Sequence, residues 1–163
     1  MIVFLALSTY AAFTDVTHYR IANSISLAIL AAFIVIAVFA GLSGAVDPWL
    51  IAGHLGAGTV MLLAGFGLFA AGVFGGGDAK LIAVSALWFG WSSLFRYAVL
   101  VALIGGLLAL ITLGLRRFVL SPAGRGPEWL NKLRSGDHGI PYGVAIAAAS
   151  WLMFCPLFAR AAS

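Results

Sequence analysis

Two aspartates stand where apolar stretches of the sequence end. Asp15 follows the apolar run 1–14, and Asp78 lies in a glycine-rich segment between two further apolar runs. An ionisable side chain at bilayer depth costs about 2.5 to 3.5 kcal/mol on insertion scales, so it rarely persists without a partner or a role. The whole chain has only five acidic residues, and these two are therefore candidates for a chemical site.

Two carboxylates in a poorly hydrated site offer an acid and a base together. At a separation of about 3 to 6 Å both cannot ionise easily, so one holds a proton while the other stays charged. The ionised group can take a proton from water as the water attacks a peptide carbonyl. The protonated group can polarise that carbonyl and later help the amine to leave. This chemistry requires neither a metal nor a cofactor, and we expect none.

The residues around the two aspartates fit such a site. Lys80 and Arg20 are near enough in the sequence to tune the pair electrostatically. Glycines permit positive φ and, without a Cβ, let an extended substrate backbone approach a carboxylate closely. Three of them precede Asp78: Gly75, Gly76 and Gly77. A purely structural interpretation is also open, in which Asp15 pairs with Arg20 at a helix end and Asp78 is the N-cap of the following helix.

The composition is that of an integral membrane protein. Hydrophobic residues make up 63% of the chain, charged residues make up 9%, and the mean hydropathy is +1.12. The net charge of +4 does not indicate nucleic-acid binding, because the nine lysines and arginines are scattered between apolar runs, as membrane topology requires. The single Cys155 excludes a disulfide framework and a cysteine zinc site within one chain. We expect one transmembrane domain over residues 1–163.

Six apolar segments predict six membrane helices: residues 1–14, 24–46, 49–74, 81–95, 97–115 and 140–158. The expected fold is an all-α integral membrane protein, a six-transmembrane-helix bundle with a cytoplasmic loop between helices 5 and 6. At about 1.5 Å per residue the first run covers roughly 20 Å of a hydrocarbon core of about 30 Å. Either Asp15 lies below the interface or the helix continues past it. The segment WFGWSS before Arg96 predicts a tight turn, with Trp88 and Trp91 as interfacial anchors.

Basic residues on alternate connections indicate the orientation. Two lie on one side, Arg96 and Arg160, and seven lie on the other: Arg20, Lys80, Arg116, Arg117, Arg125, Lys132 and Arg134. The side with seven is expected to be cytoplasmic, and because it carries both aspartates the two acids can meet there. In the long loop on this side, Trp129, Leu130 and Leu133 fit an interfacial helix after Pro127. A solvated basic connection is an equal alternative.

Other polar residues receive structural interpretations. Asp47 and Pro48 predict a helix start, with the aspartate as cap and the proline in the first position. His54 lies in that helix, on the side opposite the acids, and is expected to be packed or hydrogen-bonded. His18 and His138 lack the paired spacing of metal ligands, so no metal site is expected.

Three motifs resemble those of the type IV prepilin peptidases, which are membrane aspartyl proteases with a GxGD sequence. The motifs are Asp15 with Arg20, Ile21 and Asn23; Gly75–Leu81, with Lys80 two residues after the aspartate; and Ile140-Pro141-Tyr142-Gly143, which resembles the IPYG or IPFG opening of the last helix. Their order and spacing agree with the family, and the resemblance covers nearly the whole chain. One departure is Ala22, which stands where the family usually has proline, so the loop could turn differently.

The resemblance implies a function. Asp15 and Asp78 would be the catalytic pair of an aspartic endopeptidase that removes the leader of a prepilin or pseudopilin at the cytoplasmic face of the bacterial inner membrane. Family substrates are cut after a glycine that precedes an apolar segment. Expected partners are the substrate, the pilus or secretion assembly machinery and membrane lipid, but no nucleic acid. The residues expected near the substrate are Arg20, Asn23, Gly75, Gly76, Gly77, Lys80, Pro141, Tyr142 and Gly143.

The chain is similar to the short, peptidase-only form found with tight-adherence (Flp) pili. Larger members carry a cytoplasmic domain with paired cysteines and an N-methylating activity, and methylation by this chain is not predicted. Two alternatives stay open. A small membrane transporter or proton-conducting protein would spread its buried acids along a route through the membrane. A non-catalytic assembly partner would tolerate asparagine in place of both aspartates.

Overall fold

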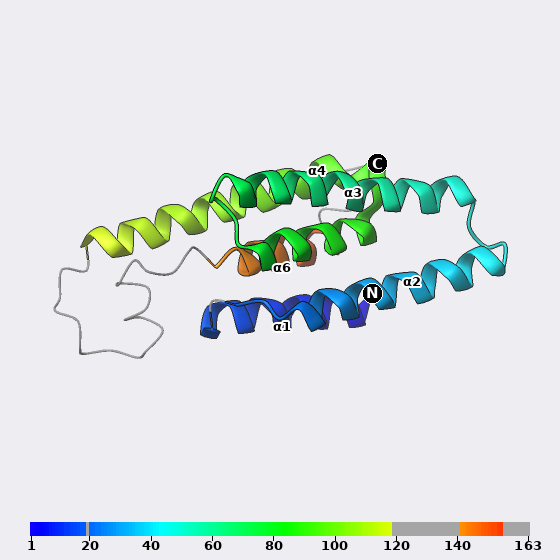
Figure 1. Ribbon diagram of the computed structural model, residues 1–163, viewed down its shortest axis with the longest axis horizontal. Helices are drawn as coiled ribbons and strands as arrows, with labels where there is room; N and C mark the ends of the chain where they lie inside the picture. Colours follow the sequence, from blue (N-terminus) through cyan, green and yellow to red (C-terminus); the bar gives the residue numbers. More distant parts are fainter. Residues whose placement is uncertain (19, 119–140, 155–163) are drawn as a thin grey trace.

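The computed structural model describes residues 1–18, 20–118 and 141–154, and every regular element in these ranges is an α-helix. The five helices are α1 (Ile2–His18), α2 (Asn23–Leu42), α3 (Pro48–Ala70), α4 (Gly76–Phe118) and α6 (Tyr142–Phe154). They lie side by side along the long direction of the molecule (Figure 1). The interfacial helix predicted in the long loop lies outside the described residues, as do His138, Cys155 and Arg160. The predicted all-α fold is confirmed.

The outer surfaces of the helices are apolar, as a lipid environment requires. α2, α3 and α4 are long and apolar enough to cross a membrane, whereas α1 and the described part of α6 are apolar but shorter. Large apolar side chains stay exposed on α2, for example Phe39 at 76% and Leu42 at 86%. α1 continues past Asp15 to His18, which was one of the two alternatives for the first helix.

The long helix α4 is broken at Gly90, where φ is 69° and ψ is −178°. The rings of Phe89 and Tyr97 have centroids 4.6 Å apart, although eight residues of straight helix would separate them by about 12 Å. The chain therefore doubles back at this glycine (Figure 1). The predicted turn in WFGWSS is confirmed, but the predicted boundary at Arg96 is wrong, because the break lies six residues earlier. Glycine takes up the left-handed backbone conformation at little cost, and arginine does not.

Trp88, expected to be an interfacial anchor, instead packs inside the bundle. Its ring stacks on Phe4 with 5.0 Å between centroids, and the ring of Phe33 meets it edge-on at 6.2 Å. Trp91 follows the break and is 61% exposed. The two tryptophans of the turn therefore have different roles, because they fall on opposite sides of Gly90.

Substitution of Gly90 by alanine is expected to destabilise the fold. A Cβ at this position would lie 3.0 Å from two atoms of the His54 ring, and a left-handed φ is strained for any L side chain. Together the strain and the overpacking should lower the free energy of unfolding by about 3 kcal/mol. Thermal unfolding of the purified protein in detergent measures the loss. Gly106→Ala is the control, since nothing lies within 4 Å of a Cβ there; equal unfolding temperatures for the two variants would contradict the prediction.

The core lies between α1, the two halves of α4, and α6. Phe4, Tyr97 and Ile146 come from these three helices and are fully buried. Phe4 also meets the rings of Phe89 and Phe154 edge-on, and α3 packs along α4. This arrangement brings the end of α1, the start of α4 and the start of α6 to one end of the bundle (Figure 1). Residues far apart in the sequence can therefore share a site there.

Two polar residues, Asp47 just before α3 and His54 within it, have the structural roles predicted for them. Oδ1 of Asp47 accepts a hydrogen bond of 2.8 Å from the backbone N–H of Trp49, with Pro48 in the first helical position. The ring of His54 donates through Nδ1 to the carbonyl oxygen of Leu87 at 2.6 Å. The aspartate is a helix cap and the histidine is a hydrogen-bonded packing residue, so both predictions are confirmed.

Candidate active site

The last turn of α1 and the first turn of α4 place Asp15 and Asp78 beside one cavity of about 610 Å³. The two side chains are near enough for their charges to interact. Both are almost fully buried, with 5% and 8% of their surface exposed. The two acids thus meet at one end of the bundle, although two long helices separate them in the sequence.

Asp15 is held in place by the beginning of α6. The backbone N–H of Gly143 donates a hydrogen bond of 2.7 Å to its Oδ2. The first N–H groups of a helix have no partner within the helix, so a carboxylate can accept from them. A Cβ at Gly143 would lie 2.8 Å from the same oxygen, closer than Cβ atoms are normally found. Glycine is therefore required at this position if the carboxylate is to lie against the helix start.

Asp78 is held by its own helix. Because α4 begins at Gly76, Asp78 is the third helical residue, and its Oδ2 accepts a bond of 3.1 Å from the N–H of Gly75, just before the helix. A side chain at the third position that reaches back to the N-cap N–H forms half of a capping box. The interpretation of Asp78 as the N-cap itself is therefore wrong. Its Oδ1 is buried and has no hydrogen-bond partner among the described residues.

The glycines before Asp78 serve close approach and not unusual backbone angles. Positive φ occurs at Gly44, Gly72 and Gly90 in the described ranges, so the GGG segment does not use the positive φ that glycine permits. A Cβ at Gly75 would lie 2.9 Å from the Asp78 carboxylate, and a Cβ at Gly77 would lie 3.1 Å from Cβ of Ile21. These contacts pack the start of α4 against its own acid and against the connection that follows α1.

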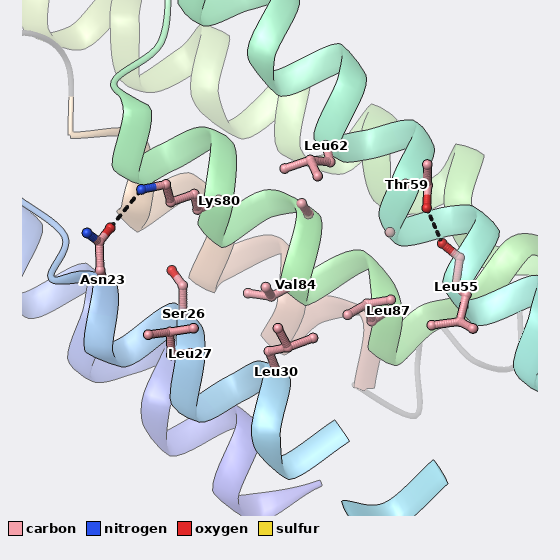
Figure 2. Close-up of a pocket in the computed structure, with 12 residues that line it drawn as sticks. Asn23, Ser26, Leu27, Leu30, Leu55, Thr59, Leu62, Lys80, Val84 and Leu87 are labelled. Atoms are coloured by element: carbon pink, nitrogen blue, oxygen red, sulfur yellow. Dashed lines mark hydrogen bonds between the residues drawn. The ribbon is translucent and has the colours of Figure 1, made fainter. Parts of the chain in front are cut away.

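The remaining predicted residues divide between the cavity and its surroundings. Arg20, Asn23 and the three glycines line the cavity with the aspartates. Nζ of Lys80 donates to Oδ1 of Asn23 at 2.9 Å, which ties the start of α4 to the start of α2 (Figure 2). Pro141 is buried just before α6. Tyr142 packs its ring against Phe74 with 4.6 Å between centroids.

Four residues that line the cavity were not among the predicted site residues: Thr14, His18, Ile21 and Ala22. Nδ1 of His18 shares a hydrogen bond of 2.7 Å with the hydroxyl of Thr17. A signal was present, since His18 is three residues after Asp15 and residues at that spacing are neighbours on a helix surface. The sequence left open whether the first helix continues past Asp15, so this spacing did not by itself identify His18 as a neighbour of Asp15.

The backbone at Ala22 has φ −66° and ψ 134°, which are angles that proline adopts. The loop therefore has a proline-compatible conformation even though proline is absent. Ala22→Pro should raise the free energy of unfolding by about 0.4 to 1 kcal/mol, because it restricts the unfolded chain. Thermal unfolding in detergent measures this gain, with Ala28→Pro in the interior of α2 as the destabilised control. A lower unfolding temperature for Ala22→Pro would show that the loop does not accommodate the ring.

The comparison with protein families matches residues 2–112 to the type IV leader peptidase family. The match covers more than half of the chain and includes both aspartates. No curated protein matches the chain, and no solved structure does. On the evidence of this match, which agrees with the motifs, the chain belongs to the type IV leader peptidase family.

Proposed function

We propose that this chain is a membrane aspartyl endopeptidase that removes the leader peptide of a prepilin or pseudopilin, with Asp15 and Asp78 as its catalytic pair. One observation carries the proposal: the two carboxylates line one cavity, and each is held through a single oxygen by a backbone N–H. The second oxygen of Asp78 is buried without a partner among the described residues. We propose that this oxygen meets a water molecule or a substrate carbonyl when the substrate binds.

The proposed reaction uses the pair as one unit. The ionised carboxylate accepts a proton from a water molecule as the water oxygen attacks the carbonyl carbon of the scissile peptide bond. The protonated carboxyl group gives its proton to the carbonyl oxygen, which forms a neutral tetrahedral intermediate. Collapse of the intermediate breaks the C–N bond, and the carboxyl group that took the water proton returns a proton to the leaving nitrogen. The carboxylate that had protonated the carbonyl oxygen takes a proton back from a hydroxyl group of the intermediate as the C=O bond re-forms. The peptide bond is hydrolysed to a carboxylic acid and an amine, and the pair again holds one proton.

The topology we propose has six spans with the site at the cytoplasmic face of the bacterial inner membrane. The break at Gly90 divides α4 into two antiparallel segments, and these with α1, α2, α3 and α6 make six. Arg20 and Lys80 lie at the end of the bundle that carries the acids, which supports a cytoplasmic orientation for that end. A site at helix ends suits a cleavage point just before an apolar helix. We also propose that the substrate is of the Flp type, as the resemblance of the sequence implies.

The proposal can be tested by co-expressing this chain with a prepilin-type test protein. The test protein carries a short basic leader, a glycine and an apolar helix, and the readout is its mass and new N-terminus with and without this chain. We expect cleavage after the glycine only when the chain is present. An uncut test protein, together with proton flux through liposomes that contain the chain, would favour the transporter alternative. The location of both acids in one cavity argues against that alternative, because a conducting route requires polar groups along its length.

A further inference from the structure

A second cavity, of about 500 Å³, lies next to the catalytic one and forms an apolar groove between α2, α3 and α4 (Figure 2). Leu27 and Leu30 of α2 form one wall, and Leu55 and Leu62 of α3 form the other. Val84 of α4 lies on the floor. Leu27 is 62% exposed and Leu55 is 51% exposed. The groove is therefore lined by leucine side chains that the protein itself leaves uncovered.

The groove is open because α2 and α3 diverge. They follow one another in the chain through a short connection, but α2 packs on α1 and α4 while α3 packs mainly along α4. Figure 1 shows the two helices separating from their connection, with the first half of α4 between them. A long apolar segment can therefore enter between them without displacing a packed helix.

The groove adjoins the catalytic cavity. Asn23 lines both of them. The hydrogen bond from Lys80 to Asn23 lies at the boundary, two residues beyond Asp78 in the sequence (Figure 2). A polypeptide whose scissile bond lies between the two aspartates has its adjoining segment at the mouth of the groove.

A buried hydroxyl near this mouth favours a peptide over a lipid chain as the occupant. Ser26 is one helical turn from Asn23, is 5% exposed and lines the groove, and its Oγ has no hydrogen-bond partner among the described residues. An unsatisfied buried polar atom is costly unless a ligand supplies a partner. The first N–H groups of an α-helix have no acceptor within that helix. A helix that begins at the mouth could donate to Ser26, whereas a hydrocarbon chain could not.

We propose that this groove binds the apolar helix that follows the cleavage point of the substrate, with the first turn of that helix at Ser26. The inference rests on the proposed peptidase function and adds to it the surface that recognises the substrate within the membrane. The groove aligns the helix, and the chain that precedes the helix then extends past Asn23 and Lys80 to the aspartates. Recognition therefore depends on an apolar helix directly after the scissile bond.

Filling the groove tests this binding. Leu27→Trp enlarges an exposed groove residue, and Val35→Trp, at a 67% exposed position of α2 outside the groove, is the matched control. Two test proteins are compared, one with an apolar helix of about 20 residues and one in which only its first few residues remain. The ratio of kcat/KM for the long substrate to that for the short one should fall about tenfold in Leu27→Trp, because a buried leucine-sized contact is lost. It should not change in Val35→Trp. An unchanged ratio in both variants would overturn the proposal.

Cross-linking provides a test that does not require turnover. Leu27→Cys is combined with Cys155→Ser, which removes the only cysteine of the sequence, and a single cysteine is placed in the apolar helix of the long test protein. Oxidation of membranes should yield a disulfide-linked product with Leu27→Cys and none with Val35→Cys.

The outcomes separate the two proposals. If no cross-linked product forms while wild type cleaves the test protein, binding in the groove is refuted and the peptidase function is not. A cross-link without cleavage by wild type would support the groove and refute the peptidase. A phospholipid that co-purifies with wild type but not with Leu27→Trp, with no cross-link, would assign the groove to lipid.

Discussion

Replacement of Asp78 by asparagine is expected to stop leader removal, with a fall in rate of about 10⁴-fold or more. Asparagine has the same shape, and its carbonyl oxygen can still accept the hydrogen bond from Gly75 that holds the start of α4. The amide cannot take up or release a proton, however, so one half of the acid–base pair is lost. Asp15→Asn should have the same effect for the same reason. Gel mobility and the mass of a co-expressed prepilin-type protein measure the loss.

Two controls distinguish loss of chemistry from loss of fold. Asp47→Asn changes an acid at the other end of the bundle, where asparagine caps a helix as well as aspartate does, and it should retain full activity. The double variant of Asp15 and Asp78 should be no less active than either single variant, because residues that act as one unit are not additive. All variants should remain in the membrane fraction in wild-type amounts. Leader removal that survives either single substitution would exclude the paired-acid mechanism.

The second large effect is expected from a residue with no reactive group. Gly143→Ala adds a Cβ that would lie 2.8 Å from Oδ2 and 3.0 Å from Cβ of Asp15. The carboxylate must then move away from the start of α6, and its hydrogen bond of 2.7 Å lengthens or breaks. A displacement of about 1 Å in a catalytic group can cost about 10²-fold in rate, and we expect a loss of that order in kcat.

Gly67→Ala and Gly106→Ala are the matched controls for this substitution. Both lie in helices with nothing within 4 Å of the added Cβ, and alanine is the better helix former. They should retain activity and unfold at the wild-type temperature or above it. Gly143→Ala with full activity would show that the contact between α6 and Asp15 is not needed for catalysis.

Hydropathy predicted the existence of α2 and α3 well but placed their ends too late. The expected segments were 24–46 and 49–74, whereas the helices are Asn23–Leu42 and Pro48–Ala70. The residues that follow each helix are themselves largely apolar. The apolar composition therefore continues past the last helical residue, although the helical conformation ends there. Gly44 and Gly72, with φ of 67° and 74°, lie in the turns that follow. Only the glycine marks the end of each helix, and glycine is also common inside these helices.

The break in α4 was misplaced for a related reason. Arg96 separates the apolar runs 81–95 and 97–115 and was therefore taken as the boundary, but backbone conformation fixes the reversal at Gly90. A charge can be accommodated by its surroundings, whereas a left-handed φ in a helix ends its hydrogen-bond ladder. The pattern of polar residues therefore predicted the segment that contains the turn, but not the residue at which the chain reverses.

The two aspartates could be predicted from the sequence because acids are rare in so apolar a chain. The groups that hold them could not be derived in the same way. The hydrogen bond from Gly143 to Asp15 joins residues 128 positions apart, and no local pattern reports such a contact. The glycines before Asp78 permit both positive φ and a close approach, and the structure shows close internal contacts at Gly75 and Gly77 without positive φ. The groove exists because α2 and α3 diverge. The sequence of neither helix alone predicts that divergence.

The bond between Gly143 and Asp15 also has a consequence for biogenesis. Asp15 belongs to α1, which leaves the ribosome before α6, but the amide that orients it belongs to α6. A nascent chain that has inserted only α1 to α4 holds both acids and lacks that amide. The proposed peptidase would therefore gain its activity only after α6 has been inserted, so that a chain without α6 cannot cut other membrane proteins during its own synthesis.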